Sequence, residues 1–186
     1  MVATPGLTGI RDPDEARRVL LEEARAADPH LGEGPVVDVG SGGGSPGIPL
    51  AVARPELRFV LLEASRRKCS FLETASAELP NVSVLCARAE EHAAGSGRDA
   101  YGTAVARALA SPPVACEWCL PLVRPGGIAL LFVGPSADEG AVARVASELG
   151  AELEDSPPGF LRMRKTGPTP ERFPRRPGMA RKRPLA

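Results

Sequence analysis

A glycine-rich segment that follows an apolar run contains the residues best placed for ligand chemistry. Residues 38–44 read Asp-Val-Gly-Ser-Gly-Gly-Gly and come directly after two valines. The absence of side chains at Gly40, Gly42 and Gly44 lets the backbone turn tightly and approach a ligand closely, and the next helix presents its N–H groups there. Such a glycine-rich turn costs conformational entropy, which disfavours a turn with no ligand. The segment therefore predicts a binding loop for a nucleoside cofactor.

Two carboxylates near this loop bear on which cofactor it holds. Residues 42–47 also fit G-x-G-x-x-G, the dinucleotide fingerprint, and Glu63 lies about twenty residues further on, where an acid binds ribose hydroxyls. Asp38 is unfavourable beside a pyrophosphate, yet it can pair directly or through water with the ammonium of a methionine moiety. S-adenosylmethionine (SAM) has no pyrophosphate. The two acids therefore favour SAM, with an NAD(P)-dependent enzyme as the alternative.

Apolar runs and helical segments alternate along the chain, as expected for a parallel sheet joined by helical crossovers. Asp12 followed by Pro13 is typical of a helix start, and this helix is predicted to end near Asp28. Further helices are predicted at 66–79, 113–123 and 138–149, and strands at 36–39, 59–62, 82–85, 103–106, 128–133, 151–154 and 160–164. The last two strands predict an antiparallel hairpin. The predicted fold is α/β, of the class I SAM-dependent methyltransferase (Rossmann-like) type, with a mostly parallel sheet and a C-terminal antiparallel hairpin.

The length of 186 residues fits a single globular unit. We expect residues 1–34 to form an N-terminal helical segment, residues 35–165 the methyltransferase domain, and residues 166–186 a basic, proline-rich tail that is extended and partly mobile. The four cysteines are expected to be reduced, with Cys116 and Cys119 as helix core residues, and no metal site is predicted. No apolar run reaches the roughly 20 residues that span a bilayer, so we expect a cytoplasmic protein with no membrane partner.

The basic residues are concentrated at one end of the chain. The sequence has 23 basic and 23 acidic residues, yet residues 162–186 hold nine basic residues and the single acid Glu171. A neutral total with one basic end indicates a polyanionic partner, although a solvated tail is the alternative. We predict RNA contacts at Arg164, Lys165, Arg172, Arg175, Arg176, Arg181 and Lys182.

Five ordered blocks of sequence resemble a single family. They are DVGSGGGSPGIPLAVA at 38–53, ARAEE at 87–91, ARALA at 106–110, EWCLPLVRPGG at 117–127 and RKTGPTPERFPRRPGMARK at 164–182. Together they resemble the RsmG family, also called glucose-inhibited division protein B, of 16S ribosomal RNA guanine-N7 methyltransferases. The resemblance implies SAM as cofactor, 16S rRNA or the 30S ribosomal subunit as partner, and SAM contacts from Gly40, Ser45, Ala89, Glu90 and Arg107.

The sequence departs from this family in two places. The family usually has a longer N-terminal helical segment, with a histidine and an aspartate near its end. It also has lysine-glycine where this chain has Val133-Gly134, which removes a cation from the rim of the site. Both departures bear on the substrate rather than on the cofactor.

The region before and at Arg107 lacks the motifs of the other common base methylations. Residues 101–107 contain neither an Asn/Asp-Pro-Pro-aromatic motif nor a Pro-Cys nucleophile. Guanine N7 needs neither, because its lone pair lies in the ring plane and carries no proton, so alignment is the main requirement. We expect Arg107 to be the catalytic residue, anchoring the cofactor or donating to guanine O6. Two alternatives to this function are a SAM-dependent methyltransferase that acts on another RNA or a small molecule, and a non-catalytic RNA-binding relative. The protein is expected to be a monomer.

Overall fold

A seven-stranded sheet forms the centre of the molecule. The computed structural model describes residue 10 and residues 12–186. Its strand order is β3-β2-β1-β4-β5-β7-β6, and the strands are β1 (Val36–Val39), β2 (Phe59–Glu63), β3 (Val82–Cys86), β4 (Tyr101–Arg107), β5 (Val123–Phe132), β6 (Ala151–Leu153) and β7 (Phe160–Lys165). Strands β1 to β5 pair in parallel, and β7 runs antiparallel to both β5 and β6. The predicted sheet and its terminal hairpin are confirmed.

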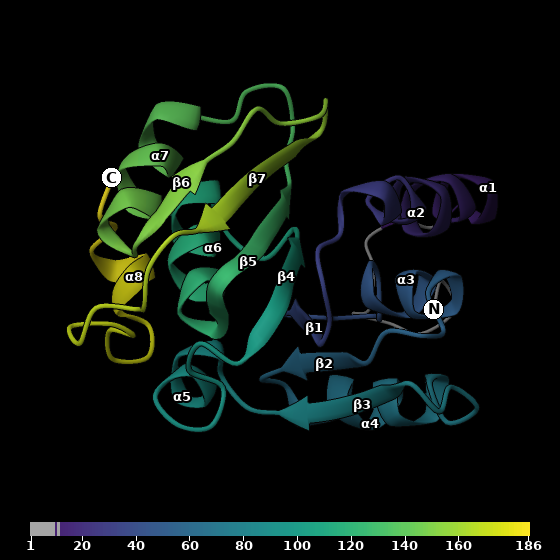
Figure 1. Ribbon diagram of the computed structural model, residues 1–186. Coiled ribbons are helices and arrows are strands. Elements are labelled where there is room, and N and C mark those ends of the chain that lie inside the picture. The colour runs from purple at the N-terminus through teal and green to yellow at the C-terminus, as the bar shows by residue number, and fades with distance from the viewer. Residues whose placement is uncertain (1–9, 11) are drawn as a thin grey trace.

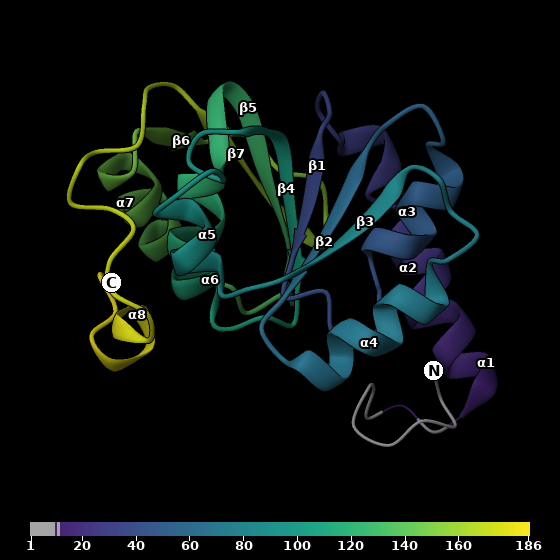
Figure 2. The ribbon, with the colours of Figure 1, turned by 90° about the horizontal axis from the view of Figure 1, so that it is seen from below.

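Helices cover both faces of this sheet, as right-handed crossovers between parallel strands require. Figures 1 and 2 show one layer made of α1 (Pro13–Arg17), α2 (Glu23–Arg25), α3 (Gly47–Ala53) and α4 (Arg66–Ala75). The other layer contains α5 (Ala89–Ala93), α6 (Pro112–Cys119), α7 (Glu139–Glu148) and α8 (Met179–Lys182). Within the described part of the chain, no helix combines the length and apolarity needed to cross a membrane.

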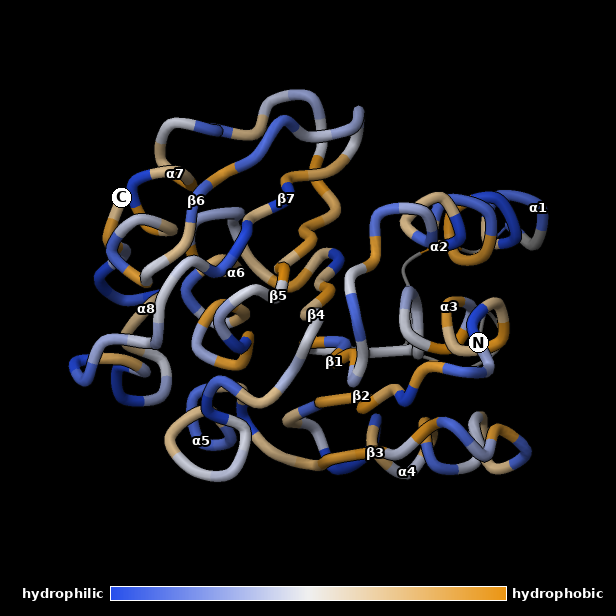
Figure 3. Tube along the Cα trace, in the orientation of Figure 1, coloured by the Kyte–Doolittle hydropathy of each residue, from blue (hydrophilic) through white to orange (hydrophobic). Residues whose placement is uncertain are grey.

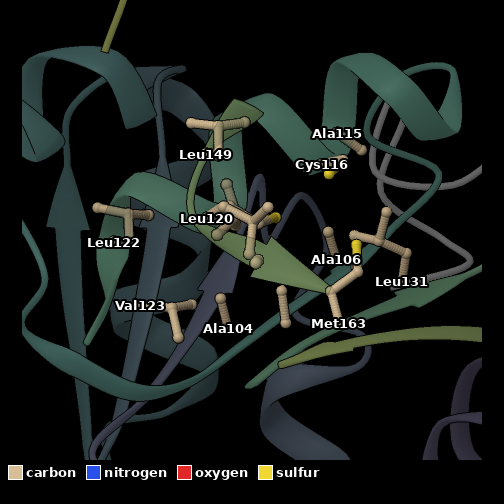
Figure 4. Close-up of a cluster of buried hydrophobic side chains, with 14 of the residues drawn as sticks. Ala104, Ala106, Ala115, Cys116, Leu120, Leu122, Val123, Leu131, Leu149 and Met163 are labelled. Atoms are coloured by element: carbon tan, nitrogen blue, oxygen red, sulfur yellow. The ribbon is translucent and has the colours of Figure 1, made fainter. Parts of the chain in front are cut away.

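The hydrophobic core occupies both sides of the sheet. Figure 3 shows apolar strands in the middle of the fold and polar residues along α1 and the outer turns. Between the sheet and α6, small and branched side chains such as Ala104, Leu122 and Leu131 are almost completely buried (Figure 4). Cys116 and Cys119 are free thiols buried in this same cluster, so they are core residues as predicted. Burial raises the pKa of the Cys119 thiol because the thiolate would be desolvated.

The N-terminal helix begins as predicted but is not uniform. The Asp12 side chain caps α1 by accepting a hydrogen bond from the Glu15 amide at 2.8 Å. Instead of continuing as one α-helix toward Asp28, the chain forms a π-helical turn at Arg18–Glu22 before α2. A π-turn widens the helix and alters its carbonyl hydrogen bonding, a feature that recurs at functional sites.

The expectation that all cysteines are reduced is wrong for one pair. Cys69 on α4 and Cys86 at the end of β3 form a disulfide, with 5.8 Å between their Cα atoms. Helix α4 returns from β2 across β3, so the two residues meet although they are 17 positions apart in sequence. The pairing depends on this crossover, which local sequence patterns do not report.

The expectation of an extended, mobile tail is also wrong. Residues 166–186, here called the C-terminal segment, fold back against α6, and Figure 1 shows this yellow segment beside that helix. Arg98 donates hydrogen bonds to the carbonyl oxygens of Thr169 at 2.6 Å and of Pro170 at 3.2 Å. The Phe173 ring is buried in the main core. Prolines end regular structure here, yet side-chain donors and apolar contacts hold the chain in place.

Candidate cofactor and substrate site

A cavity of about 320 Å³ opens at the carboxyl ends of β1, β2 and β3, and we call it the first cavity. Ligands of open parallel sheets bind at this edge, where strand order reverses. Four residues predicted to bind the cofactor line it: Gly40, Glu63, Ala89 and Glu90. The predicted loop, the end of β2 and the start of α5 are therefore brought together around one space.

The glycine loop has the backbone that its sequence predicts. Gly40 has φ +72° and Gly44 has φ +94°, in the left-handed region that favours glycine. A Cβ atom at Gly40 would collide with the Leu109 side chain, and one at Gly44 with Ile48. The loop thus depends on glycine for conformation as well as for space.

Glu63 connects the loop to the first cavity. Its two carboxylate oxygens accept hydrogen bonds from the Gly42 amide at 3.0 Å and from the Ser65 amide at 2.8 Å. Each carboxylate oxygen has a further lone pair, so the group can still accept from a ribose diol. The side chain is mostly buried yet lines the cavity, which fits a carboxylate that a nucleoside would complete.

Asp38 lies beneath the loop and does not line the first cavity. Its Oδ2 accepts from the Gly47 amide at 3.0 Å at the start of α3. Among the described residues, its Oδ1 has no hydrogen-bond partner although the side chain is buried. Burial raises the pKa of Asp38 to about 7, against the opposing effects of the Gly47 bond and of Arg107. A buried carboxyl with a free oxygen fits a nearby cation such as an ammonium group; its predicted contact with the methionine moiety stays a prediction.

Ser45 and Arg107 are tied to the N-terminal helix. The Ser45 hydroxyl donates to the Leu20 carbonyl at 2.8 Å, and the Arg107 guanidinium donates to the Val19 carbonyl and, at 3.4 Å, to the Ser45 oxygen. Both carbonyls belong to the π-helical turn. Burial lowers the pKa of Arg107, while the charges of Glu23 and Asp38 oppose this shift. The turn therefore fixes the position of Arg107 at the end of β4.

A second cavity of about 570 Å³ contains Arg107. Its walls include the rings of Phe132 and Phe160, which meet edge to face with 4.8 Å between centroids. Ala108, the residue after β4, lines both cavities, so the two spaces adjoin. Val133, which replaces the lysine of the resembled family, lies on the wall of this second cavity.

Two further residues in these walls are not among the site residues that the sequence predicts. Glu23 in α2 faces the second cavity near Arg107, and Trp118 on α6 lines the first cavity. Glu23 looks in sequence like one more acid on a charged helix. Trp118 is the only tryptophan of the chain and stands in the block at 117–127 that resembles the family, and these two signals could have marked it.

Most of the residues predicted to contact RNA have partners within the protein. Lys165 has a fully buried side chain, and its ammonium donates to Thr169 at 2.6 Å and to the Leu120 carbonyl at 2.9 Å, so it is not at the surface for RNA. Burial lowers its pKa, whereas Asp99 opposes that shift. The other ion pairs join Arg164 to Glu154, Arg172 to Glu148 and Arg175 to Glu117. Arg176, Arg181 and Lys182 are exposed.

The family comparison agrees with this arrangement. Residues 3–155 match the profile of the family described as "GidB: rRNA small subunit methyltransferase G". The chain belongs to this family. Relatives named ribosomal RNA small subunit methyltransferase G include those of Synechococcus elongatus, 37% identical over 96% of this chain and 82% of the relative, and of Rubrobacter xylanophilus, 40% identical over 92% and 70%. The resemblance on five sequence blocks is confirmed.

Solved structures show the same fold at low sequence identity. One is the O-methyltransferase NcsB1 of neocarzinostatin biosynthesis in complex with SAM, with a TM-score of 0.60, 16% identity, and coverage of 74% of this chain and 50% of that chain. Another is TYW2 from M. jannaschii in complex with AdoMet, with a TM-score of 0.60, 17% identity, and coverage of 76% and 71%. The fold is that of the SAM-dependent methyltransferases, and SAM is the cofactor of the family.

Proposed function

We propose that this protein transfers a methyl group from SAM to N7 of a guanine in the 16S rRNA of the small ribosomal subunit. The observation that carries the proposal is the pair of cavities that adjoin at Ala108, with Glu63 on the wall of the first and Arg107 on that of the second. Such an arrangement fits a cofactor and a base that meet at the end of β4. Family membership supports the rRNA substrate, because the relatives carry that name.

On the cofactor side, the residues of the first cavity bind SAM and orient it. When bound, SAM supplies a methyl group that its sulfonium charge activates. Glu63 would hold the ribose diol through its remaining lone pairs, and Glu90, which follows the next strand of the sheet, would hold the adenine. Asp38, which lies beneath the loop, would stabilise the ammonium group directly or through water. None of these groups has to move a proton.

On the substrate side, the second cavity aligns the guanine base of the RNA. Phe132 and Phe160 offer an apolar wall on which an unstacked base can pack. Arg107 donates one hydrogen bond to guanine O6 and leaves N7 free, since a bidentate grip on both atoms would block the reaction. The N7 lone pair needs no general base, so alignment and exclusion of water are the contributions of the protein.

The RNA backbone meets a basic rim rather than a free tail. Lys68 and Arg88 line the first cavity, and Arg176 and Lys182 are exposed on the C-terminal segment. Their charges would attract RNA phosphates to the rim of the first cavity and to the C-terminal segment. The reaction belongs in the cytoplasm, with 16S rRNA or the 30S subunit as partner and one chain as the active unit.

A labelling experiment tests the proposal. The protein is incubated with methyl-labelled SAM and either unmodified 16S rRNA or 30S subunits, and the modified base is mapped. We expect one labelled guanine, with the label at N7. Label on another base position, or label on small molecules but none on rRNA, would contradict the substrate assignment.

A further inference from the structure

The end of the C-terminal segment lies at the first cavity. Gly178 and Arg181 both line that space, together with Trp118 and Leu109 from the central fold. The sequence predicts either RNA contacts or a solvated tail for this segment. Its position instead makes it part of the surface that a cofactor would contact.

A hydrogen bond connects this segment to an acid of the same cavity. The Gly178 amide donates to Glu90 Oε1 at 2.9 Å, and Glu90 is only 7% exposed. Gly178 has φ +78°, so glycine suits the turn that aims its amide at the carboxylate. One oxygen of Glu90 is thereby held, which fixes the plane of the carboxylate and the direction of its other lone pairs.

Three contacts anchor the segment next to that hydrogen bond. Arg175 binds the buried Glu117 of α6 in a two-pronged ion pair, with its Nε 2.6 Å from Oε1 and its Nη2 2.5 Å from Oε2. Arg181 lies over the Trp118 ring at 5.1 Å from the centroid and donates to the Leu109 carbonyl at 3.0 Å. A bidentate arginine pair is geometrically specific, so it fixes the register of the segment on α6.

We propose that the C-terminal segment forms one wall of the cofactor pocket, and that Arg175 and the Gly178 amide are positioning groups that hold Glu90 for the 6-amino group of the adenine. The strand order supports the assignment, because methionine, ribose and base would follow the ends of β1, β2 and β3 in turn, and Glu90 comes after β3. This inference rests on the proposed function, since it takes the first cavity to hold SAM.

Calorimetry with two ligands tests the positioning role. S-adenosylhomocysteine keeps the amino group, whereas S-inosylhomocysteine has a carbonyl oxygen there, which Glu90 would repel. We expect Arg175→Gln to weaken S-adenosylhomocysteine binding about tenfold and to reduce the preference over the inosine analogue, because Glu90 is no longer held. The matched control is Arg172→Gln, which makes the same charge change in the same segment but loses an exposed pair with Glu148 and a contact with the Phe173 ring, none of which lines the first cavity. In the absence of RNA, Arg172→Gln should leave the affinities for S-adenosylhomocysteine and for S-inosylhomocysteine unchanged.

Equal losses for both ligands in Arg175→Gln, or no loss at all, would overturn the proposal. A second measurement needs no variant. Binding of S-adenosylhomocysteine to the intact protein should slow amide hydrogen exchange in residues 174–183, and leave exchange in α7 as it was. Binding without slower exchange in residues 174–183 would show that the C-terminal segment is not a wall of the cofactor pocket, but would not contradict the proposed methyltransferase function. No binding of S-adenosylhomocysteine at all would instead refute the proposed function.

Discussion

Replacing Asp38 by asparagine should change how the stability of the protein depends on pH. The carboxyl is buried beneath the glycine loop, and burial raises its pKa from 3.8 to about 7. Asparagine has nearly the same shape and can still accept from the Gly47 amide, but it has no proton to release. The variant therefore removes the titration while it keeps the packing.

The size and sign of this change in stability follow from the pKa values of Asp38 in the unfolded and in the folded chain. Below pH 3.8 both the folded and the unfolded chain keep the proton, so Asp38 does not lower the free energy of unfolding there. As pH rises toward 7, the unfolded chain releases the proton and the folded chain retains it, which lowers the free energy of unfolding. One pKa unit corresponds to about 1.4 kcal/mol, so the loss reaches about 4 kcal/mol near pH 7 and then levels off.

Urea denaturation at pH 5, 6, 7 and 8 measures this effect. We expect the free energy of unfolding of Asp38→Asn, relative to the wild type, to increase by about 2 kcal/mol between pH 5 and pH 7 and to change little above pH 7. A constant offset from the new amide does not affect this slope. The control is Asp155→Asn, the same change at an exposed position, which should follow the wild type at every pH. Parallel curves for Asp38→Asn and the wild type would refute the reasoning.

Three further changes test the site and the segment that follows β7. Arg107→Ala should reduce turnover at least tenfold in the labelling assay, because guanine O6 loses its donor; unchanged SAM affinity and unchanged turnover would show that the role is wrong. Glu63→Gln should weaken SAM binding about tenfold in calorimetry, since an amide NH2 group, which is a donor, replaces one of the two oxygens that accept from the ribose diol, and equal affinity would exclude that contact. Lys165→Met should lower the free energy of unfolding by about 3 kcal/mol in urea, because Asp99 and the Leu120 carbonyl lose a buried donor; a loss below about 0.5 kcal/mol would mean that water replaces it.

The local pattern of the sequence was enough for the seven strands, for the start of α1 and for the glycine loop. Alternating apolar runs predict β1 to β7, and Asp12 predicts the start of α1, because strand and helix periods and caps are properties of a few neighbouring residues. The positive φ angles of Gly40, Gly42 and Gly44 are also a property of the local sequence, because glycine adopts them without a side-chain clash. The acid at Glu63 was predicted from its distance along one βαβ unit, and it lies where that unit requires.

Contacts between distant residues were decided by the tertiary structure alone. Arg175 meets Glu117 across 58 positions, and Lys165 meets Asp99 across 66, so no spacing rule could pair them. For that reason the sequence predicts a free tail at the basic end of the chain, although Arg172 and Arg175 pair with acids of the central fold. Side-chain pairing depends on which surfaces the fold brings together, and that is known only once the sheet and its two helical layers are assembled.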